Sequence, residues 1–223
     1  MVKLDVKSHT YTDNDKNKYK SVSHILDSIE PAFDPDGSII ARVAAREGVT
    51  IEEIRKRWDK ISDDSLKKGS DIHDALSQHI INKKKSTKWK EVIDAFEKLR
   101  FTGTLNSEQI LYNKERLIAG TADLTEETKY YTNVYDFKTS KFIEFFSIYG
   151  QQMMLPPVDH LAHCNYNRYS LQLSFYAWML EQQGKKIGKL GIIWITSNLK
   201  MFMYPCNYLK LEVEKILETY DIK

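Results

Sequence analysis

Cysteine is scarce in this sequence, with Cys164 and Cys206 as the only two among 223 residues. Two distant cysteines cannot supply a four-cysteine zinc or iron–sulfur site, and they do not suggest a disulfide framework. No apolar run approaches the roughly 18 residues that a membrane-spanning helix needs. Residues 1–20 are polar and contain no apolar signal core, so we expect no secretory signal. A reducing cytoplasm is the expected compartment.

An excess of charge of one sign is also missing, because the formal net charge is only +2. Any nucleic-acid site must therefore be a local basic patch and not a field that covers the whole surface. The hydrophobic share of 42% and the charged share of 29% are typical of soluble globular proteins. The length suits one domain with additions, and we expect a single domain over residues 1–223.

The periodicity of the sequence changes near residue 104, from helical spacing to alternation. A capping box at Thr50 and Glu53 predicts a helix to about residue 61, and residues 62–64 predict the cap of another. The expected helices are 21–29, 51–61, 63–82, 89–99, 169–183 and 208–220, the expected turn is 34–37, and the expected strands are 108–112, 117–124, 131–138, 190–196 and 201–204. The order predicts an α/β fold with a central mixed sheet flanked by helices (104–223) and a mainly helical N-terminal portion (1–103).

Two acidic residues and a lysine fall on successive expected strands. Alternation places Asp136 and Lys138 on one face of the third strand, about 7 Å apart at the backbone. If that strand pairs with the preceding one as a hairpin, Asp123 converges on Asp136. Neighbouring carboxylates repel unless a cation lies between them, and oxygen ligands select hard ions such as magnesium or manganese. Alone, an Asp-x-Lys pattern is a weak signal, because it is more typical of a solvated strand face.

A histidine lies in the middle of an apolar helical stripe. Leu66, Gly69, His73, Leu76 and Ile80 recur at spacings of three and four, so they share one face that we expect to point into the protein. A neutral imidazole there is a competent metal ligand. The alternative is a core histidine that a hydrogen bond satisfies.

The expected helix 169–183 is apolar nearly all round, which indicates burial. Gln172 and Tyr176 are four residues apart and share a face. A buried amide and a buried phenol must find hydrogen-bond partners. That face points either at the acid–lysine site or the substrate, or at ordinary core partners.

In this order the motifs resemble the PD-(D/E)XK nuclease superfamily, and specifically its RecB-like branch. The segments that carry the resemblance are Gly69-Ser70-Asp71-Ile72-His73, Gly120-Thr121-Ala122-Asp123, Asp136-Phe137-Lys138-Thr139-Ser140 and Gln172-Leu173-Ser174-Phe175-Tyr176. They look like the G-x-x-x-H, G-x-x-D, D-x-K-T-S and Q-x-x-x-Y motifs of that branch. The segments 19–23 and 165–169 are similar to stand-alone phage exonucleases of the branch.

The resemblance implies a restriction-endonuclease-like core and a role for each motif residue. His73, Asp123, Asp136 and the backbone carbonyl of Phe137 would bind Mg²⁺ or Mn²⁺, and Lys138 would be the catalytic lysine. The implied contacts with the site or the DNA come from Gln172, Tyr176 and Thr139. Glu108, on the strand before Asp123, is either an added carboxylate or an ordinary edge-strand charge.

The expected activity is hydrolysis of DNA phosphodiester bonds, with an exonuclease on free or single-stranded ends favoured. The alternatives are a structure-specific or sequence-specific endonuclease of the same fold and a non-catalytic DNA-binding module. The missing cysteines argue against the iron–sulfur members of the branch. Recombination or replication proteins are candidate partners, no membrane is expected, and a phage-encoded chain would act in the bacterial host cytoplasm.

Overall fold

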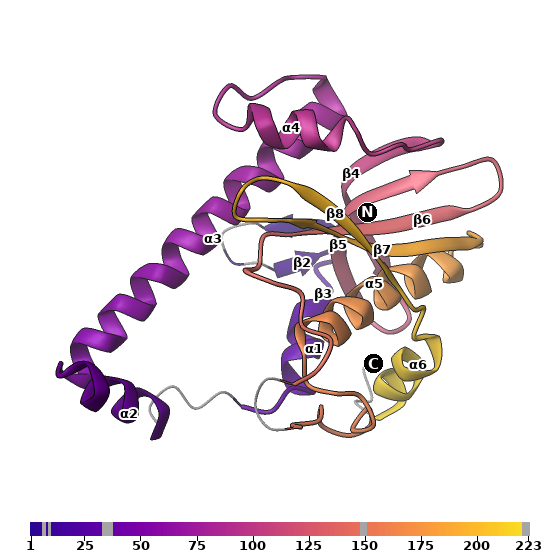
Figure 1. Ribbon diagram of the computed structural model, residues 1–223. Helices are drawn as coiled ribbons and strands as arrows, with labels where there is room; N and C mark the ends of the chain where they lie inside the picture. The colour runs from indigo at the N-terminus through magenta and orange to yellow at the C-terminus, as the bar shows by residue number, and fades with distance from the viewer. Residues whose placement is uncertain (6–7, 9, 33–37, 148–150, 220–223) are drawn as a thin grey trace. The chain divides into compact units, whose positions relative to one another are not determined.

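The structure is a computed structural model that describes residues 1–223 except 6–7, 9, 33–37, 148–150 and 220–223 (Figure 1). The chain divides into two compact units, one of Met1–Pro31 with Ala75–Lys223 and one of Ala32–Asp74. The first unit contains the sheet, and the second contains helices only among its described residues. The turn expected at residues 34–37 lies outside the described residues.

A mixed sheet forms the first unit, which confirms the α/β class. Its order is β1-β2-β3-β5-β6-β7-β8, and β4 also pairs with β5. The β3–β5 and β6–β7 pairs are parallel, while the other pairs are antiparallel. The strands are β1 (Lys3–Asp5), β2 (Thr10–Thr12), β3 (Lys18–Ser21), β4 (Thr104–Asn113), β5 (Ile118–Glu127), β6 (Thr132–Lys138), β7 (Ile187–Ile195) and β8 (Met201–Cys206).

Two different strands share one edge of β5. The ladder with β4 runs along β5 from Ile118 to Glu127, so both other partners must lie on the opposite edge. On that edge β3 pairs with Ile118 and Ala119, whereas β6 pairs with residues 124–127. Residues 120–123 of β5 therefore lie between the ends of two ladders. This short segment ends at Asp123.

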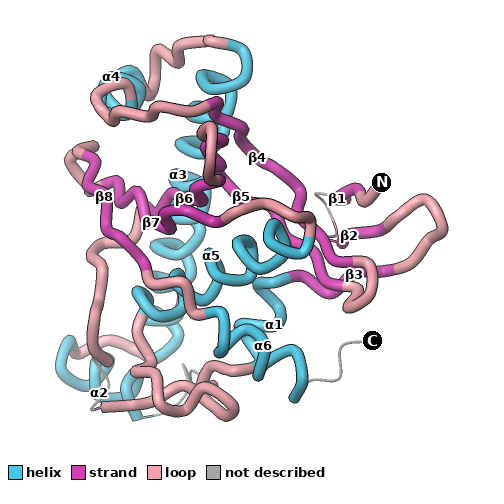
Figure 2. Tube along the Cα trace, turned by 90° about the vertical axis from the view of Figure 1, so that its right-hand side faces the viewer, coloured by secondary structure: helices cyan, strands magenta, loops and turns pink. Residues whose placement is uncertain are grey.

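Helix α5 (Asn165–Gln182) lies against one face of the sheet, with α1 (Val22–Ser28) and α6 (Lys210–Thr219) beside it (Figures 1 and 2). Every residue from Ser170 to Leu180 except Gln172 is buried, which confirms the expectation of a helix that is apolar nearly all round. The helix begins four residues before the predicted start. Its aliphatic and aromatic side chains, together with Ile25, Val134 and Ile192, form the main hydrophobic core.

Aromatic side chains cover the opposite face of β6. Phe96, the last residue of α4 (Lys90–Phe96), packs edge-on against Phe137, and Phe101 packs edge-on against Tyr135. Asp136 and Lys138 contact each other, and Lys138 reaches α5 through Gln172. The predicted alternation along β6 is therefore confirmed.

The second unit contains α2 (Ser38–Glu47) and the first part of α3 (Ile51–Asn82). Ile40, Ala44 and Ile54 form its small core. The predicted capping box is confirmed, because the N–H of Glu53 donates to Thr50 Oγ1 at 3.2 Å and the N–H of Thr50 donates to Glu53 Oε2 at 2.8 Å.

The predicted helix end at residue 61 is wrong, because α3 continues without a break for 32 residues. Residues 61–65 contain no glycine or proline, and the Ser65 hydroxyl donates to the carbonyl of Ile61 within the helix.

The predicted apolar stripe of α3 is wrong at its first residue, since Leu66 is 70% exposed while Leu76 is fully buried. The strands β1–β3 and the helix α2 were not expected from the sequence.

A buried carboxylate ties the strand β5 to the segment before β4. Glu126 Oε1 accepts the backbone N–H groups of Thr102 (2.6 Å) and Gly103 (2.9 Å), and its Oε2 accepts Asn133 Nδ2 (2.8 Å) and the Tyr135 hydroxyl (3.3 Å). Burial alone would raise the pKa of Glu126, but these hydrogen bonds to the charged form outweigh it and lower the pKa.

We expect Glu126→Gln to lower the free energy of unfolding by about 2–3 kcal/mol at neutral pH, because an amide must turn its NH₂ toward groups that donate. A folded-state pKa below the unfolded value means that the carboxylate stabilises the fold above the unfolded pKa and loses this contribution as the pH falls through the folded pKa. Denaturant unfolding from pH 7 down to pH 3 should therefore show the gap between wild type and variant narrowing at the acid end. The exposed Glu115→Gln is the control, and a gap independent of pH would contradict the prediction.

Candidate active site

The strands β5 and β6 form the predicted hairpin and stop pairing at the acidic residues. The ladder runs from the pair of Glu127 and Thr132 to the pair of Leu124 and Tyr135. One step further, Asp123 Oδ2 accepts the backbone N–H of Phe137 at 2.8 Å. The carboxylate thus continues the hydrogen bonding where the backbone ladder ends. This bond fixes Asp123 beside the segment that carries Asp136 and Lys138.

Asp136 and Lys138 form an ion pair inside this unit. Lys138 Nζ lies 2.5 Å from Asp136 Oδ2, and the side chains are 20% and 1% exposed. Burial opposes the charge of Lys138, but the carboxylates of Asp136 and Asp123 outweigh it and raise the pKa of the ammonium group. Lys138 is therefore a cation at neutral pH, which suits stabilisation of negative charge better than removal of a proton.

Two side chains of α5 contact the lysine, and a third bonds to one of them. Lys138 Nζ donates to Gln172 Oε1 at 3.3 Å, and Gln172 Nε2 donates to the Tyr176 hydroxyl at 3.0 Å. The ammonium group also lies 4.6 Å from the centre of the Tyr169 ring. Burial, and then the negative charge of Asp136, raises the pKa of Tyr176 well above its ordinary value, so the phenol stays neutral.

The interpretation that Gln172 and Tyr176 share a face toward the acid–lysine residues therefore agrees with these contacts. Tyr169 was not predicted as a site residue, although its spacing from Gln172 and Tyr176 gives a helical signal. It precedes Gln172 by three residues and Tyr176 by seven, which places all three on one stripe of a helix.

Gly120 allows the ring of Tyr176 to approach the strand β5. A Cβ atom at Gly120 would lie 2.6 Å from Tyr176 Cε1 and 3.2 Å from Val22 Cγ2. Tyr176 is only 3% exposed, so its ring has little room to move. The glycine of the Gly120–Asp123 segment thus has a packing role, three residues before the carboxylate.

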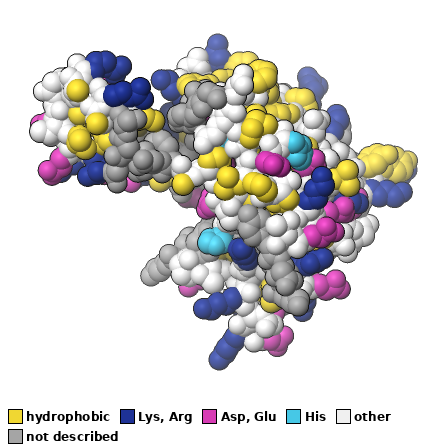
Figure 3. All heavy atoms as spheres, turned by 90° about the horizontal axis from the view of Figure 1, so that it is seen from below, with side chains coloured by type: hydrophobic (Ala, Val, Ile, Leu, Met, Phe, Trp, Pro, Cys, Tyr) yellow, Lys and Arg dark blue, Asp and Glu magenta, His cyan; other side chains and the backbone are white. Residues whose placement is uncertain are grey.

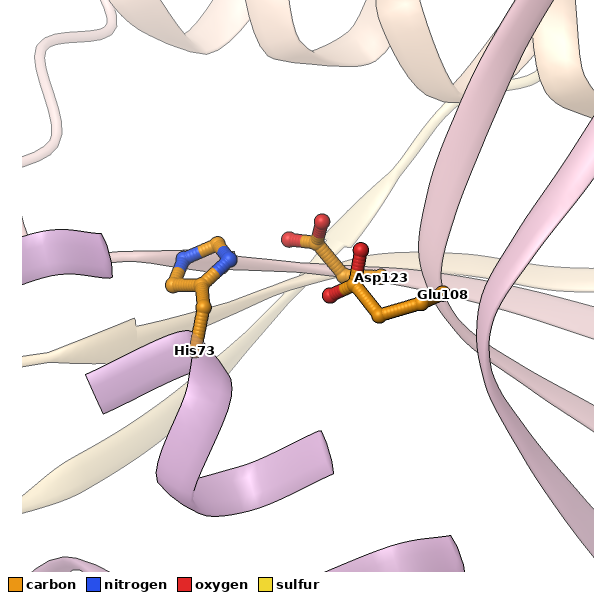
Figure 4. Close-up of side chains that lie close together, drawn as sticks. All are labelled: His73, Glu108 and Asp123. Atoms are coloured by element: carbon orange, nitrogen blue, oxygen red, sulfur yellow. The ribbon is translucent and has the colours of Figure 1, made fainter. Parts of the chain in front are cut away.

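A possible set of metal ligands contains two of the four predicted ligands together with Glu108, the residue with two possible roles. One ligand atom each from His73, Glu108 and Asp123 lies within 4.8 Å of the others (Figure 4). His73 comes from α3, and Glu108 and Asp123 come from β4 and β5. Of the remaining predicted ligands, Asp136 pairs with Lys138, and the backbone carbonyl of Phe137 stays a prediction.

Glu108 adopts an unusual backbone conformation opposite Asp123. The ladder pairs Ser107 with Leu124 and Gln109 with Ala122, so Glu108 faces Asp123 in the same register. Its φ of 55° lies in the left-handed region, which non-glycine residues rarely adopt. Of the two roles considered for Glu108, this arrangement favours the additional carboxylate.

The chemistry of this donor set fits a hard divalent cation. Two carboxylates so close together repel each other, and a cation between them removes the repulsion. Carboxylate oxygens suit Mg²⁺ and Mn²⁺, and an imidazole nitrogen suits the transition metals. Thr139 directly follows Lys138 and is partly exposed, and its contact with substrate stays a prediction.

Comparisons with known proteins do not name a family for this chain. No family model matches it, and no curated protein matches it. Among solved structures it is similar to the crystal structure of SSO0001, with 21% sequence identity and a TM-score of 0.29, over 52% of this chain and 48% of that one. The chain spans about half the length of that protein, and a likeness this weak supports no inference about function. No helix among the described residues is long and apolar enough to cross a membrane.

We expect Gly120→Ala to lower the free energy of unfolding by about 1–3 kcal/mol, because the new methyl group meets the buried ring of Tyr176. Urea denaturation of the single variants and of the double variant with Tyr176→Ala measures this as a coupling energy. Removal of the ring should relieve most of the cost at residue 120. Additive effects of the two substitutions would contradict the packing role of Gly120.

Proposed function

We propose that this chain is a metal-dependent deoxyribonuclease with a restriction-endonuclease-like core of the RecB-like PD-(D/E)XK type, acting as an exonuclease on free or single-stranded DNA ends. One observation carries the proposal. Where β5 and β6 part, Asp123 is fixed by the N–H of Phe137 while Lys138 contacts Asp136 and Gln172. Two acids and a lysine, held together by backbone and by a buried helix, suit hydrolysis of a phosphodiester.

The residues divide this work between them. His73, Glu108 and Asp123 would hold the ion, which when bound polarises a phosphoryl oxygen and lowers the pKa of a water ligand. The Lys138 ammonium group is placed to stabilise the negative charge that builds on the phosphoryl oxygens. Asp136 and Gln172 orient that ammonium group, so little rearrangement is needed when the charge develops.

In the proposed nuclease, attraction of DNA must depend on local cations such as Lys138. The net charge is +2, and Figure 3 shows basic and acidic side chains interspersed over the face that it presents. A surface of mixed sign provides no general field for a polyanion. Binding should therefore weaken steeply when a cation near the acids is removed.

We expect Lys138→Met to reduce hydrolysis of labelled linear DNA by about 100- to 1,000-fold, because the substitution keeps an unbranched side chain of similar length and removes its ammonium group. EDTA should abolish hydrolysis by the wild type. Lys129→Met, in the turn at the other end of β6, is the matched control and should keep full activity.

Cleavage by Lys138→Met at the wild-type rate would refute the role of the lysine. A comparison of linear single strands, linear duplex and closed circular DNA then tests whether the activity is that of an exonuclease or an endonuclease. Cutting of closed circles would identify an endonuclease. If the folded wild type binds DNA and cuts none of these substrates with Mg²⁺ or Mn²⁺, the chain is a binding module.

Metal binding is testable without catalysis. We expect Mn²⁺ at about 100 times its Kd to stabilise the wild type by about 2–3 kcal/mol, seen as a rise in Tm. Glu108→Gln should show less than half of this rise, because it removes one carboxylate of the set. The exposed Glu115→Gln should respond like the wild type. An equal rise in Tm for Glu108→Gln would exclude Glu108 as a ligand.

A further inference from the structure

A row of aromatic side chains begins beside Lys138 and runs to the edge of the sheet. Lys138 of β6 pairs with Trp194 of β7, and Trp194 pairs with Phe202 of β8, the last strand of the sheet order. Neighbouring strands lie about 4.8 Å apart, so the backbone of Phe202 is roughly 10 Å from that of Lys138. The row therefore leads from the candidate active site to the last strand of the sheet.

The rings touch one another along this row. The Trp194 and Phe202 rings are 5.9 Å apart at 36°, and the Trp194 and Tyr204 rings are 6.0 Å apart at 48°. Phe145 continues the series, 5.8 Å from Tyr204 and 4.7 Å from Tyr166. We call these five residues the aromatic strip. Its neighbouring rings lie at the separations typical of packed aromatic pairs, so they support one another.

The strip is held in place and still open to solvent. Trp194 Nε1 donates to the carbonyl of Ser140 at 2.8 Å, which ties the indole to the loop directly after Lys138. Phe202 is 48% exposed and Phe145 is 44% exposed, while Trp194 and Tyr204 are partly exposed. Flat, accessible rings are the type of surface on which nucleobases stack.

Positive charge accompanies the strip. Lys138 lies at its inner end, and Lys141 directly follows Ser140, whose carbonyl accepts the indole N–H. Lys200 immediately precedes β8, and it is exposed like Lys141. A ligand that combines flat apolar groups with a negative backbone matches this combination. Duplex DNA presents the negative backbone, but its bases are already stacked on one another.

We propose that the aromatic strip binds single-stranded DNA by stacking its bases, and so leads the strand to the candidate active site. The inference rests on the proposed nuclease function and narrows its substrate to single-stranded DNA. The row from Lys138 to Phe202 connects the surface to the site, and the lysines along it match the phosphates.

The test measures binding of a fluorescein-labelled 12-mer of thymidine by anisotropy in EDTA, so that no hydrolysis is required. We expect Phe202→Ala to weaken binding by about 5- to 100-fold, as for loss of one stacked base. Phe202→Tyr, which keeps the ring, should bind within about twofold of the wild type. Tyr130→Ala removes an aromatic side chain that is 65% exposed and precedes the start of β6, and it should leave binding unchanged. Circular dichroism and Tm confirm that each variant is folded.

A 12-mer with abasic sites separates stacking from other causes. The wild type should bind it more weakly, and Phe202→Ala should cause little further loss. The inference is overturned if the wild type does not bind the 12-mer, or if Phe202→Ala leaves its binding unchanged. It is also overturned if the substitution weakens the abasic strand equally, if blunt duplex shows the same dependence, or if the dependence appears only with a uridine 12-mer of RNA.

The two proposals can fail separately. Base-dependent loss of binding in Phe202→Ala, with no hydrolysis of DNA by the wild type, would support stacking on the aromatic strip and refute the proposed nuclease activity. Hydrolysis of single strands by the wild type, with unchanged binding by Phe202→Ala, would support the nuclease activity and refute stacking on the aromatic strip.

Discussion

The hydrogen bond from the Phe137 N–H to the Asp123 carboxylate determines how the candidate active site is built. It occurs one step beyond the last backbone pair of β5 and β6, where residues 120–123 lie between two ladders on the same edge of β5. A carboxylate bonded to backbone has a fixed direction, so it needs no further side chain to orient it. Because the bond starts from Phe137, it also fixes the residues on either side. The backbone positions of Asp136 and Lys138 are therefore fixed by the same hydrogen bond.

In the proposed nuclease, the ion pair of Asp136 and Lys138 serves to orient a cation more than to stabilise the fold. Removing two charges from water costs several kcal/mol per ion, and the attraction between them often only balances this loss. Here the pair keeps extra partners, since Lys138 also bonds to Gln172 and lies over the ring of Tyr169. The carboxylates keep the lysine charged, and α5 keeps it in one position. A fixed cation in a partly dry site has a much stronger effect on developing negative charge than a mobile one on the surface.

Elements with long, regular patterns were predictable, and elements defined by tertiary contacts were not. The alternation along β6 and the apolar residues of α5 each determine an element locally, and both are confirmed. The strands β1–β3 are only three or four residues long and partly polar, so alternation gives no clear signal there. The residues 62–64 can cap a helix, but they are also tolerated on its exposed surface, and only a glycine or proline would have forced an end. Helical spacing indicated that Gln172 and Tyr176 share a face. It could not show that this face meets Lys138, which is 34 residues away in the sequence.

Glu108 shows why the possible set of metal ligands was the least predictable part of the candidate site. The pairs on either side of it keep one register, so the irregular conformation is confined to a single residue opposite Asp123. A left-handed conformation costs a residue with a Cβ atom roughly 1 kcal/mol, and placing a second carboxylate near Asp123 adds repulsion. Neither cost is visible in the sequence, because both arise only when β4 lies beside β5. Both become understandable if the group is built for a cation, since a bound ion turns the repulsion between Glu108 and Asp123 into shared attraction. A glycine at residue 108 would relieve the backbone strain and keep the ladder, but it would remove the carboxylate.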